Sequence, residues 1–189
     1  PINEADNSGV IRGVSEIGSS WKGWVYQYPG AIGPIPLLAK NAHAVGMMII
    51  APEKDGVVRR MPLIIAIGDK LYPSMSMEIL RMAAGDISYQ MKTGIAGVEK
   101  LRIPKFKMID TDVHGNIWLD FKWKTPTYAL HEKLPDLTGK IVIVSITASG
   151  LDNPVSTPVG VIHSHDLIGS SLATMMTGRK ITRPYWTNV

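Results

Sequence analysis

Two adjacent arginines, Arg59 and Arg60, have the chemistry to recognise a charged ligand. The planar guanidinium group presents its donors in a fixed fork that matches a carboxylate or a phosphate. Because neighbouring residues of a strand point to opposite faces, we expect one arginine to face solvent or a ligand and the other to be paired. Two interpretations stay open: a structural ion pair with Asp55 or another carboxylate, or direct contact with an anionic ligand.

A second group, His163, His165 and Asp166, has the residue types of a metal site. On a strand the two histidines would share a face, but at the start of a helix their side chains diverge by about 200°. The helical pattern begins here, and Asp166 suits a first turn, where the helix dipole favours an acid. We therefore assign no metal ligand, keep a metal-binding module as an alternative, and name His163, Arg59 and Arg60 as candidate ligand-binding residues.

Serine, histidine and aspartate residues also gather between residues 145 and 166. A hydrolase would need a nucleophile, a base and an orienting acid in contact. The segment lacks a G-x-S-x-G elbow, and the loop 147–154 lacks the glycine patterns of nucleotide sites. A small serine/histidine hydrolase is thus the alternative from a different functional class, and we predict no catalytic residue and no cofactor.

The composition narrows the choice further. A chain of 189 residues that is 45% hydrophobic and 19% charged fits one globular domain with a sizeable core. The absence of cysteine excludes disulfides, thiolate metal sites and a cysteine nucleophile. The net charge of +4 is scattered rather than concentrated on one element, so we predict no nucleic-acid binding. No apolar stretch approaches the roughly 18 residues of a membrane span, and we expect any anchor to lie outside this sequence.

The strands that must position these residues are indicated by apolar runs and turn signals. Asp55-Gly56 favours a hairpin, and we expect the strand 57–67 to pair antiparallel with the buried run 45–50. Pro62 would then sit at a bulge or on an unpaired side. Further strands are predicted near 99–103, 106–110 and 117–123, with a core strand over 140–146.

Two amphipathic helices are predicted beside these strands. The first covers about 74–84, opens at Pro73-Ser74 and closes at Gly85. The second covers 165–177 and ends at Gly178. A short helix, 36–44, begins at Pro36. The expected fold is α/β: a single domain with a mixed, largely antiparallel sheet and packed helices.

The opening 36 residues are rich in turn-forming residues and carry an aromatic cluster (Trp21, Trp24, Tyr26 and Tyr28). The cluster could line a ligand groove, but we expect it to pack a peripheral arm onto the core.

Several short motifs follow one another in a fixed order between Ile35 and Pro184. The order is 55-DGVVRRMPL-63, Pro73-Ser74, 112-DVHGNI-117, 139-GKIV-142, 147-TASGLD-152 and Thr157-Pro158, and then a helix ending near Gly178-Arg179. Together they resemble the CHASE type-two domain, the cyclase/histidine-kinase-associated sensory extracellular module of bacterial membrane receptors. Two features depart from the family pattern: no W-P-W-like opening precedes residue 35, and Ser145 replaces a glycine at a strand end.

The resemblance implies an extracytoplasmic ligand-sensing domain on the periplasmic face of a bacterial membrane, and not an enzyme. The cyclase or kinase output would lie outside this chain. The implied partners are a small-molecule or peptide ligand, a second copy in a homodimer formed through the parent receptor, and the membrane through flanking transmembrane helices outside this chain. We divide the sequence into an N-terminal arm or incomplete opening segment (1–36), a sensory domain (37–184) and a membrane-proximal tail (185–189).

The C-terminal segment supports this orientation. Basic residues run into Tyr185 and Trp186, as is typical of a chain that reaches a membrane interface. We predict that residues 180–189 lie at the membrane-proximal end and that the helix 165–177 transmits any ligand-induced shift. The alternative is a basic surface tail in a soluble protein.

Overall fold

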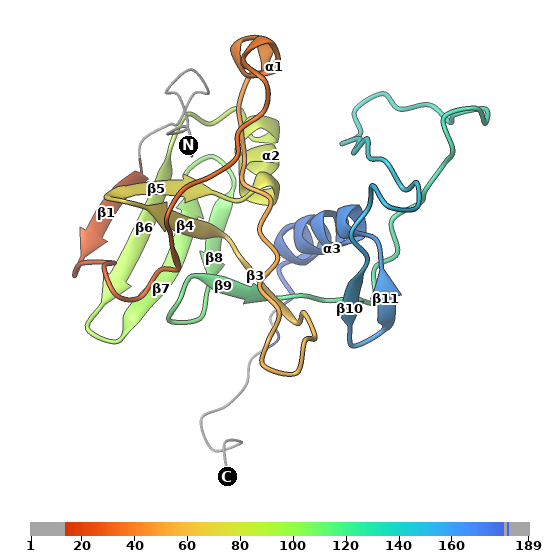
Figure 1. The fold of residues 1–189 in the computed structure, drawn as a ribbon. Helices are drawn as coiled ribbons and strands as arrows, with labels where there is room; N and C mark the ends of the chain where they lie inside the picture. Colours follow the sequence, from red (N-terminus) through yellow and green to blue (C-terminus); the bar gives the residue numbers. More distant parts are fainter. Residues whose placement is uncertain (1–13, 180, 182–189) are drawn as a thin grey trace.

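The computed structural model describes residues 14–179 and residue 181 (Figure 1). Its largest sheet has the strand order β1-β6-β7-β8. The four strands are β1 (Val14–Gly18), β6 (Tyr89–Gly94), β7 (Gly97–Ile103) and β8 (Lys107–Asp110). β1 runs parallel to β6, and the other two pairs are antiparallel. Burial alternates along β6, where Tyr89, Met91 and Thr93 are buried, so one face of this sheet lies on the core.

Three smaller sheets hold the other strands of the described residues. β2 (Gln27–Tyr28), β4 (Ile64–Ile67) and β5 (Lys70–Pro73) form one sheet in the order β2-β4-β5. β3 (Arg60–Pro62) pairs antiparallel with β9 (Asn116–Trp118), and β10 (Val155–Thr157) with β11 (Gly160–Ile162). The predicted α/β class with mixed, largely antiparallel strands is confirmed. The strands nevertheless form four sheets instead of the single one expected.

The three predicted helices are present as α1 (Pro36–Asn41), α2 (Met75–Ala83) and α3 (Ser164–Thr177). The side chain of Ser74 caps α2 by accepting the Met77 N–H at 3.3 Å. Gly178 ends α3 in the left-handed conformation, with φ 67°. In Figure 1, α3 lies between the β10–β11 hairpin and the end of the large sheet at β8. Local signals therefore placed the helices well.

A buried polar network holds α2 against β6. The Arg81 guanidinium donates to both carboxylate oxygens of Glu78, and the Tyr89 hydroxyl donates to the same carboxylate. Glu78 and Arg81 are 3% exposed, so the ion pair is enclosed by the core. Burial, followed by the hydrogen bond to Glu78, raises the pKa of Tyr89 far above its ordinary value. The phenol therefore stays a hydrogen-bond donor at physiological pH.

The aromatic arm packs onto the core, as the sequence predicted. Trp21 and Val25 are almost completely buried in the main hydrophobic cluster. Tyr26 and Tyr28 pack against a smaller cluster that contains Ile65. Residues from the first 36 therefore help to build the interior, and β1 extends the large sheet.

The predicted pairing of 45–50 with 57–67 is wrong. Residues 45–50 make one isolated bridge, between Met47 and Ser74, and it is parallel. The run 57–67 contributes two strands, β3 and β4. β4 pairs with β5 because the turn at Gly68-Asp69 brings β5, the next strand in the sequence, back alongside it. Gly46 lies so close to α2 that a Cβ there would meet the Met75 Cα at 2.4 Å, and this backbone contact takes the place of strand pairing.

The predicted core strand at 140–146 is also wrong. No residue from 119 to 154 belongs to a helix or strand, and this segment extends away from the sheets (Figure 1). Val142, Val144 and Ile146 are exposed, whereas Ile143 packs against the core. An apolar run becomes a strand only where a neighbouring strand takes its backbone hydrogen bonds, and no strand of the described residues pairs with it. The strand predicted over 117–123 stops at Trp118, and the Leu119 N–H makes one further hydrogen bond, to the Arg59 carbonyl at 3.0 Å.

Candidate ligand-binding site

Arg59 is held by two carboxylates on the turn that precedes β3. Its Nη1 and Nη2 atoms donate to the two oxygens of Asp55 at 3.0 and 2.7 Å, and Nη1 also donates to Glu53 at 3.0 Å. The hydrogen bond from Arg59 lowers the pKa of Asp55 to about 2. The ion pair expected with Asp55 is thus present, in the bidentate geometry that guanidinium groups favour.

Arg60, the first residue of β3, is paired on several sides. Its Nε donates to Glu53 at 3.0 Å and its Nη1 to Asp112 at 2.9 Å. Its guanidinium carbon lies 5.1 Å from the centre of the Trp118 ring, a cation–π distance. Burial lowers the pKa of Arg60, but the hydrogen bonds to Glu53 and Asp112 outweigh it, so the pKa is raised. The group therefore stays charged.

Strand geometry led us to expect that the two arginines point to opposite faces, and this expectation is wrong. Glu53 accepts from Arg59 with one carboxylate oxygen and from Arg60 with the other. The reason is that β3 begins only at Arg60, so Arg59 is outside the strand and free of its alternation. One carboxylate therefore joins both guanidinium groups into a single charged cluster.

The Asp112–Asn116 turn, residues 112–116, fixes the other side of Arg60. Asp112 Oδ1 accepts the backbone N–H groups of His114 and Asn116 at 3.0 and 2.9 Å. Its Oδ2 accepts from Arg60 and from the Asn116 side-chain amide, both at 2.9 Å. Gly115 has φ 80°, which other residues rarely adopt. The motif 112–117 therefore begins with a tight turn, and its aspartate also binds Arg60.

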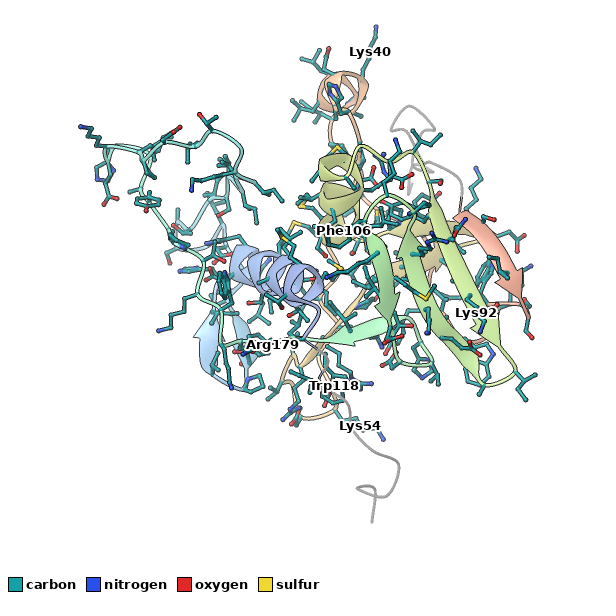
Figure 2. All side chains as sticks on the ribbon, turned by 180° about the vertical axis from the view of Figure 1, so that it is seen from behind. Lys40, Lys54, Lys92, Phe106, Trp118 and Arg179 are labelled. Carbon is teal, nitrogen blue, oxygen red and sulfur yellow. The ribbon has the colours of Figure 1, made fainter. Side chains whose placement is uncertain are left out.

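A hollow of about 590 Å³ opens beside this cluster. It is lined by Tyr26, Ala51, Pro52, Glu53, Lys54, Asp55, Arg60 and Asn116. An aromatic wall with convergent polar groups suits a small polar molecule. Figure 2 places Lys54 at the same end of the molecule as Trp118 and Arg179. Arg60 lines the hollow, whereas Arg59 is not part of the lining.

His163 lies elsewhere, at the N-cap of α3. Its Nδ1 is 2.5 Å from Asp152 Oδ2, and the hydroxyl of Ser164 donates to the other oxygen of Asp152 at 2.9 Å. The hydrogen bond with His163 lowers the pKa of Asp152. Within the described part of the chain, no serine hydroxyl bonds to the His163 ring, so the contacts that a hydrolase requires are not assembled here.

The two histidine rings stack instead of diverging. Their centres are 5.4 Å apart and their planes differ by 13°. The expected divergence is wrong because His163 has extended backbone angles, φ −72° and ψ 151°, and does not yet follow the helix. Among residues 14–179 and 181, no three His, Cys, Asp or Glu side chains are grouped so as to hold a metal ion.

A family model described as the CHASE2 domain matches residues 5–189, which is nearly the whole chain. The chain belongs to the CHASE2 domain family. CHASE2 domains are sensory extracellular domains, a class that binds signals and does not catalyse reactions. No curated protein and no solved structure matched this chain in the comparisons. None of the described helices has both the length and the apolar character of a membrane span.

Within this CHASE2 domain, two motifs far apart in the sequence meet at one place. The Asp55–Leu63 motif and the Asp112–Ile117 motif are joined by the β3–β9 pairing, which sets Arg60 opposite Trp118. The sequence singled out both motifs but gave no sign of their contact. Glu53 and Trp118 were not predicted as part of the site, since neither lies in a distinctive pattern. The predicted tail 185–189 lies outside the described residues.

Proposed function

We propose that this CHASE2 domain is the extracytoplasmic, periplasmic ligand-sensing domain of a bacterial membrane receptor. The match to a sensory extracellular family over residues 5–189 carries the proposal. A cyclase or kinase output would belong to other parts of the receptor, and the receptor would hold two such domains as a homodimer. A ligand would act by binding one conformation or dimer arrangement better than the other.

The ligand-contacting residues are proposed on geometry. Arg60 is the best placed of the three candidates, because it lines the 590 Å³ hollow and connects β3 to the Asp112–Asn116 turn. A ligand carboxylate at this point would compete with Glu53 and Asp112 for the guanidinium. We propose that this exchange of partners changes how β3 and β9 are held together. Arg59 and His163 remain proposed contacts of lower rank, since neither lines the hollow.

The placement outside the membrane can be tested by cysteine labelling, because the 189-residue chain has no cysteine. Ile95 lies between β6 and β7 and is 96% exposed. In the parent protein, Ile95→Cys should react with a membrane-impermeant maleimide in intact spheroplasts. The unsubstituted protein gives the background, and Leu63→Cys, at a fully buried position, should stay unlabelled while the domain is folded. Labelling of Ile95→Cys only after lysis would contradict the proposal.

The role of Arg60 can be tested by a matched pair of variants. Arg60→Gln should change the ligand response of the parent receptor, whereas Arg59→Gln should leave it close to normal, because only Arg60 lines the hollow. Equal effects of the two substitutions on the ligand response would contradict the higher rank that we give to Arg60.

A further inference from the structure

A second hollow, of about 280 Å³, lies on the other side of the Asp112–Asn116 turn. Its walls are β8, the residues around β9 and the C-terminal end of α3, and it shares Asn116 with the first hollow. Figure 2 shows Trp118 and Arg179, both lining residues, at the same end of the molecule. The sequence gave no sign of this hollow.

Two residues that line this hollow each have a buried side-chain oxygen with no hydrogen-bond partner among the described residues. These oxygens are Thr111 Oγ1 and Asn116 Oδ1, two of the three such side-chain atoms among the described residues. Asn116 is only 2% exposed. Its amide orientation is fixed, because Nδ2 donates to Asp112 and a carboxylate can only accept. Buried polar groups are almost always satisfied, so a pair of orphans beside one cavity indicates that something else supplies their partners.

The charges around the hollow are divided between its walls. The strand and turn side carries Asp110, which pairs with Lys100 at 3.5 Å, and Asp112, whose two oxygens are bound by Arg60 and by the turn. Two cationic groups lie at the helix end: the ammonium of Lys107, a β8 residue whose Nζ donates to the Met176 carbonyl, and Arg179, which donates to Asp120 at 3.2 Å. The Arg179 side chain is 63% exposed and has further donors available in its fork. An acceptor-rich wall thus faces a cationic one.

We propose that this hollow binds a small zwitterion of the α-amino acid class. The ammonium group would donate to Asn116 Oδ1 and Thr111 Oγ1, and the carboxylate would accept hydrogen bonds from the Arg179 guanidinium. The volume suits a compact molecule. The orphan atoms supply the acceptors that an ammonium group needs, and a neutral or purely anionic molecule would leave one wall unused. Binding of an amino acid at this hollow does not depend on which side of a membrane the domain lies, so the proposal goes beyond the proposed function.

Titration calorimetry of the 189-residue chain tests the proposal directly. The probes are the twenty amino acids, with ethanolamine and glycolate as matched molecules that lack the carboxylate or the ammonium group. We expect at least one amino acid to bind, and both matched molecules to bind at least about tenfold more weakly, because each loses a charged hydrogen bond. The absence of binding by every amino acid would overturn the proposal. So would ethanolamine or glycolate binding as tightly as the best amino acid.

Two variants place the binding at the hollow. Thr111→Val keeps the side-chain shape and removes only the hydroxyl, so affinity should fall about tenfold while thermal stability is unchanged or higher. Arg179→Gln, at an exposed position, should weaken binding of the amino acid more than binding of ethanolamine. Thr127→Val, in the exposed stretch 122–142, is the control and should bind normally. Normal binding by both Thr111→Val and Arg179→Gln would overturn the assignment, and the maleimide labelling result would be unaffected by it.

Discussion

The two hollows share Asn116, but they differ in whether their polar groups have hydrogen-bond partners. In the first, the guanidinium of Arg60 is bound by two carboxylates and lies over an aromatic ring. In the second, Thr111 Oγ1 and Asn116 Oδ1 are buried without partners among the described residues. Charged residues that stand out in a sequence tend to be those that the fold pairs internally, since an unpaired buried charge is costly. Neutral polar residues, whose burial costs less, can be left without a partner inside the protein. Substitutions at the two hollows should therefore separate stability from binding.

Loss of the turn aspartate should have the largest effect. Asp112→Ala removes the acceptor of two backbone N–H groups, the Asn116 amide and Arg60. We expect the free energy of unfolding to fall by about 2–4 kcal/mol. Urea denaturation measures this, with Asp112→Asn as the matched control, because an amide oxygen still accepts from the backbone. An equal loss in both variants would mean that the negative charge of Asp112, and not its hydrogen bonds to the backbone, stabilises the fold.

Arg60→Ala should have a smaller effect, about 1–2 kcal/mol, because the side chain is 31% exposed and water screens its ion pairs. Arg60→Met keeps the aliphatic stem against Trp118 and should recover part of the loss. Denaturation of the two variants under identical conditions measures the difference. A stability equal to that of the wild type would mean that Arg60 is not a structural tie between β3 and β9.

Acid should remove the contribution of the Arg59–Asp55 pair. The folded pKa of Asp55, about 2, lies below the ordinary value of 3.8. The stabilisation is therefore fully present above pH 4 and is lost as the pH falls toward 2. We expect the difference in unfolding free energy between the wild type and Arg59→Ala to shrink over this range. Chemical denaturation at pH 5, 3 and 2 measures it, and a constant difference would contradict the assigned pairing.

The smallest stability effect is expected at the second hollow. Thr111→Val removes a hydroxyl that has no partner among the described residues, so the melting temperature should stay the same or rise slightly. Differential scanning calorimetry without added ligand measures it. A clear fall in melting temperature would reveal a structural hydrogen bond of Thr111 and weaken the contrast between the hollows.

The sequence predicted the parts of this fold that depend on local signals. Ser74 marks the start of α2 and Gly178 marks the end of α3. Both could be predicted because a capping side chain and a left-handed glycine act within one turn of the chain. Strand partners depend on residues far away in the sequence. The apolar runs 45–50 and 140–146 therefore resembled buried strands, although the structure gives neither a ladder of partners. The pattern of apolar residues shows that a segment can be buried, but it does not show which strand the segment pairs with.

The site was predictable only in its separate pieces. Arg60 and the Asp112–Asn116 turn each belonged to a motif, but their contact follows from the register of β3 on β9. Asp55 was expected as a possible partner of an arginine, and Glu53 was missed. Thr111 and Asn116 resemble ordinary turn residues, and their missing partners can be recognised only in three dimensions.

The central claim is that the Asp112–Asn116 turn and the two hollows beside it form the ligand-responsive part of this CHASE2 domain. An amide NMR titration of the 189-residue chain, with the amino acid that binds best in calorimetry, tests it most directly. We expect the largest shifts at Thr111, Asn116 and Gly178, with smaller shifts at Arg60, which is joined to the turn through Asp112. Shifts confined to the exposed stretch 122–142, or no shifts at a saturating concentration, would contradict the account.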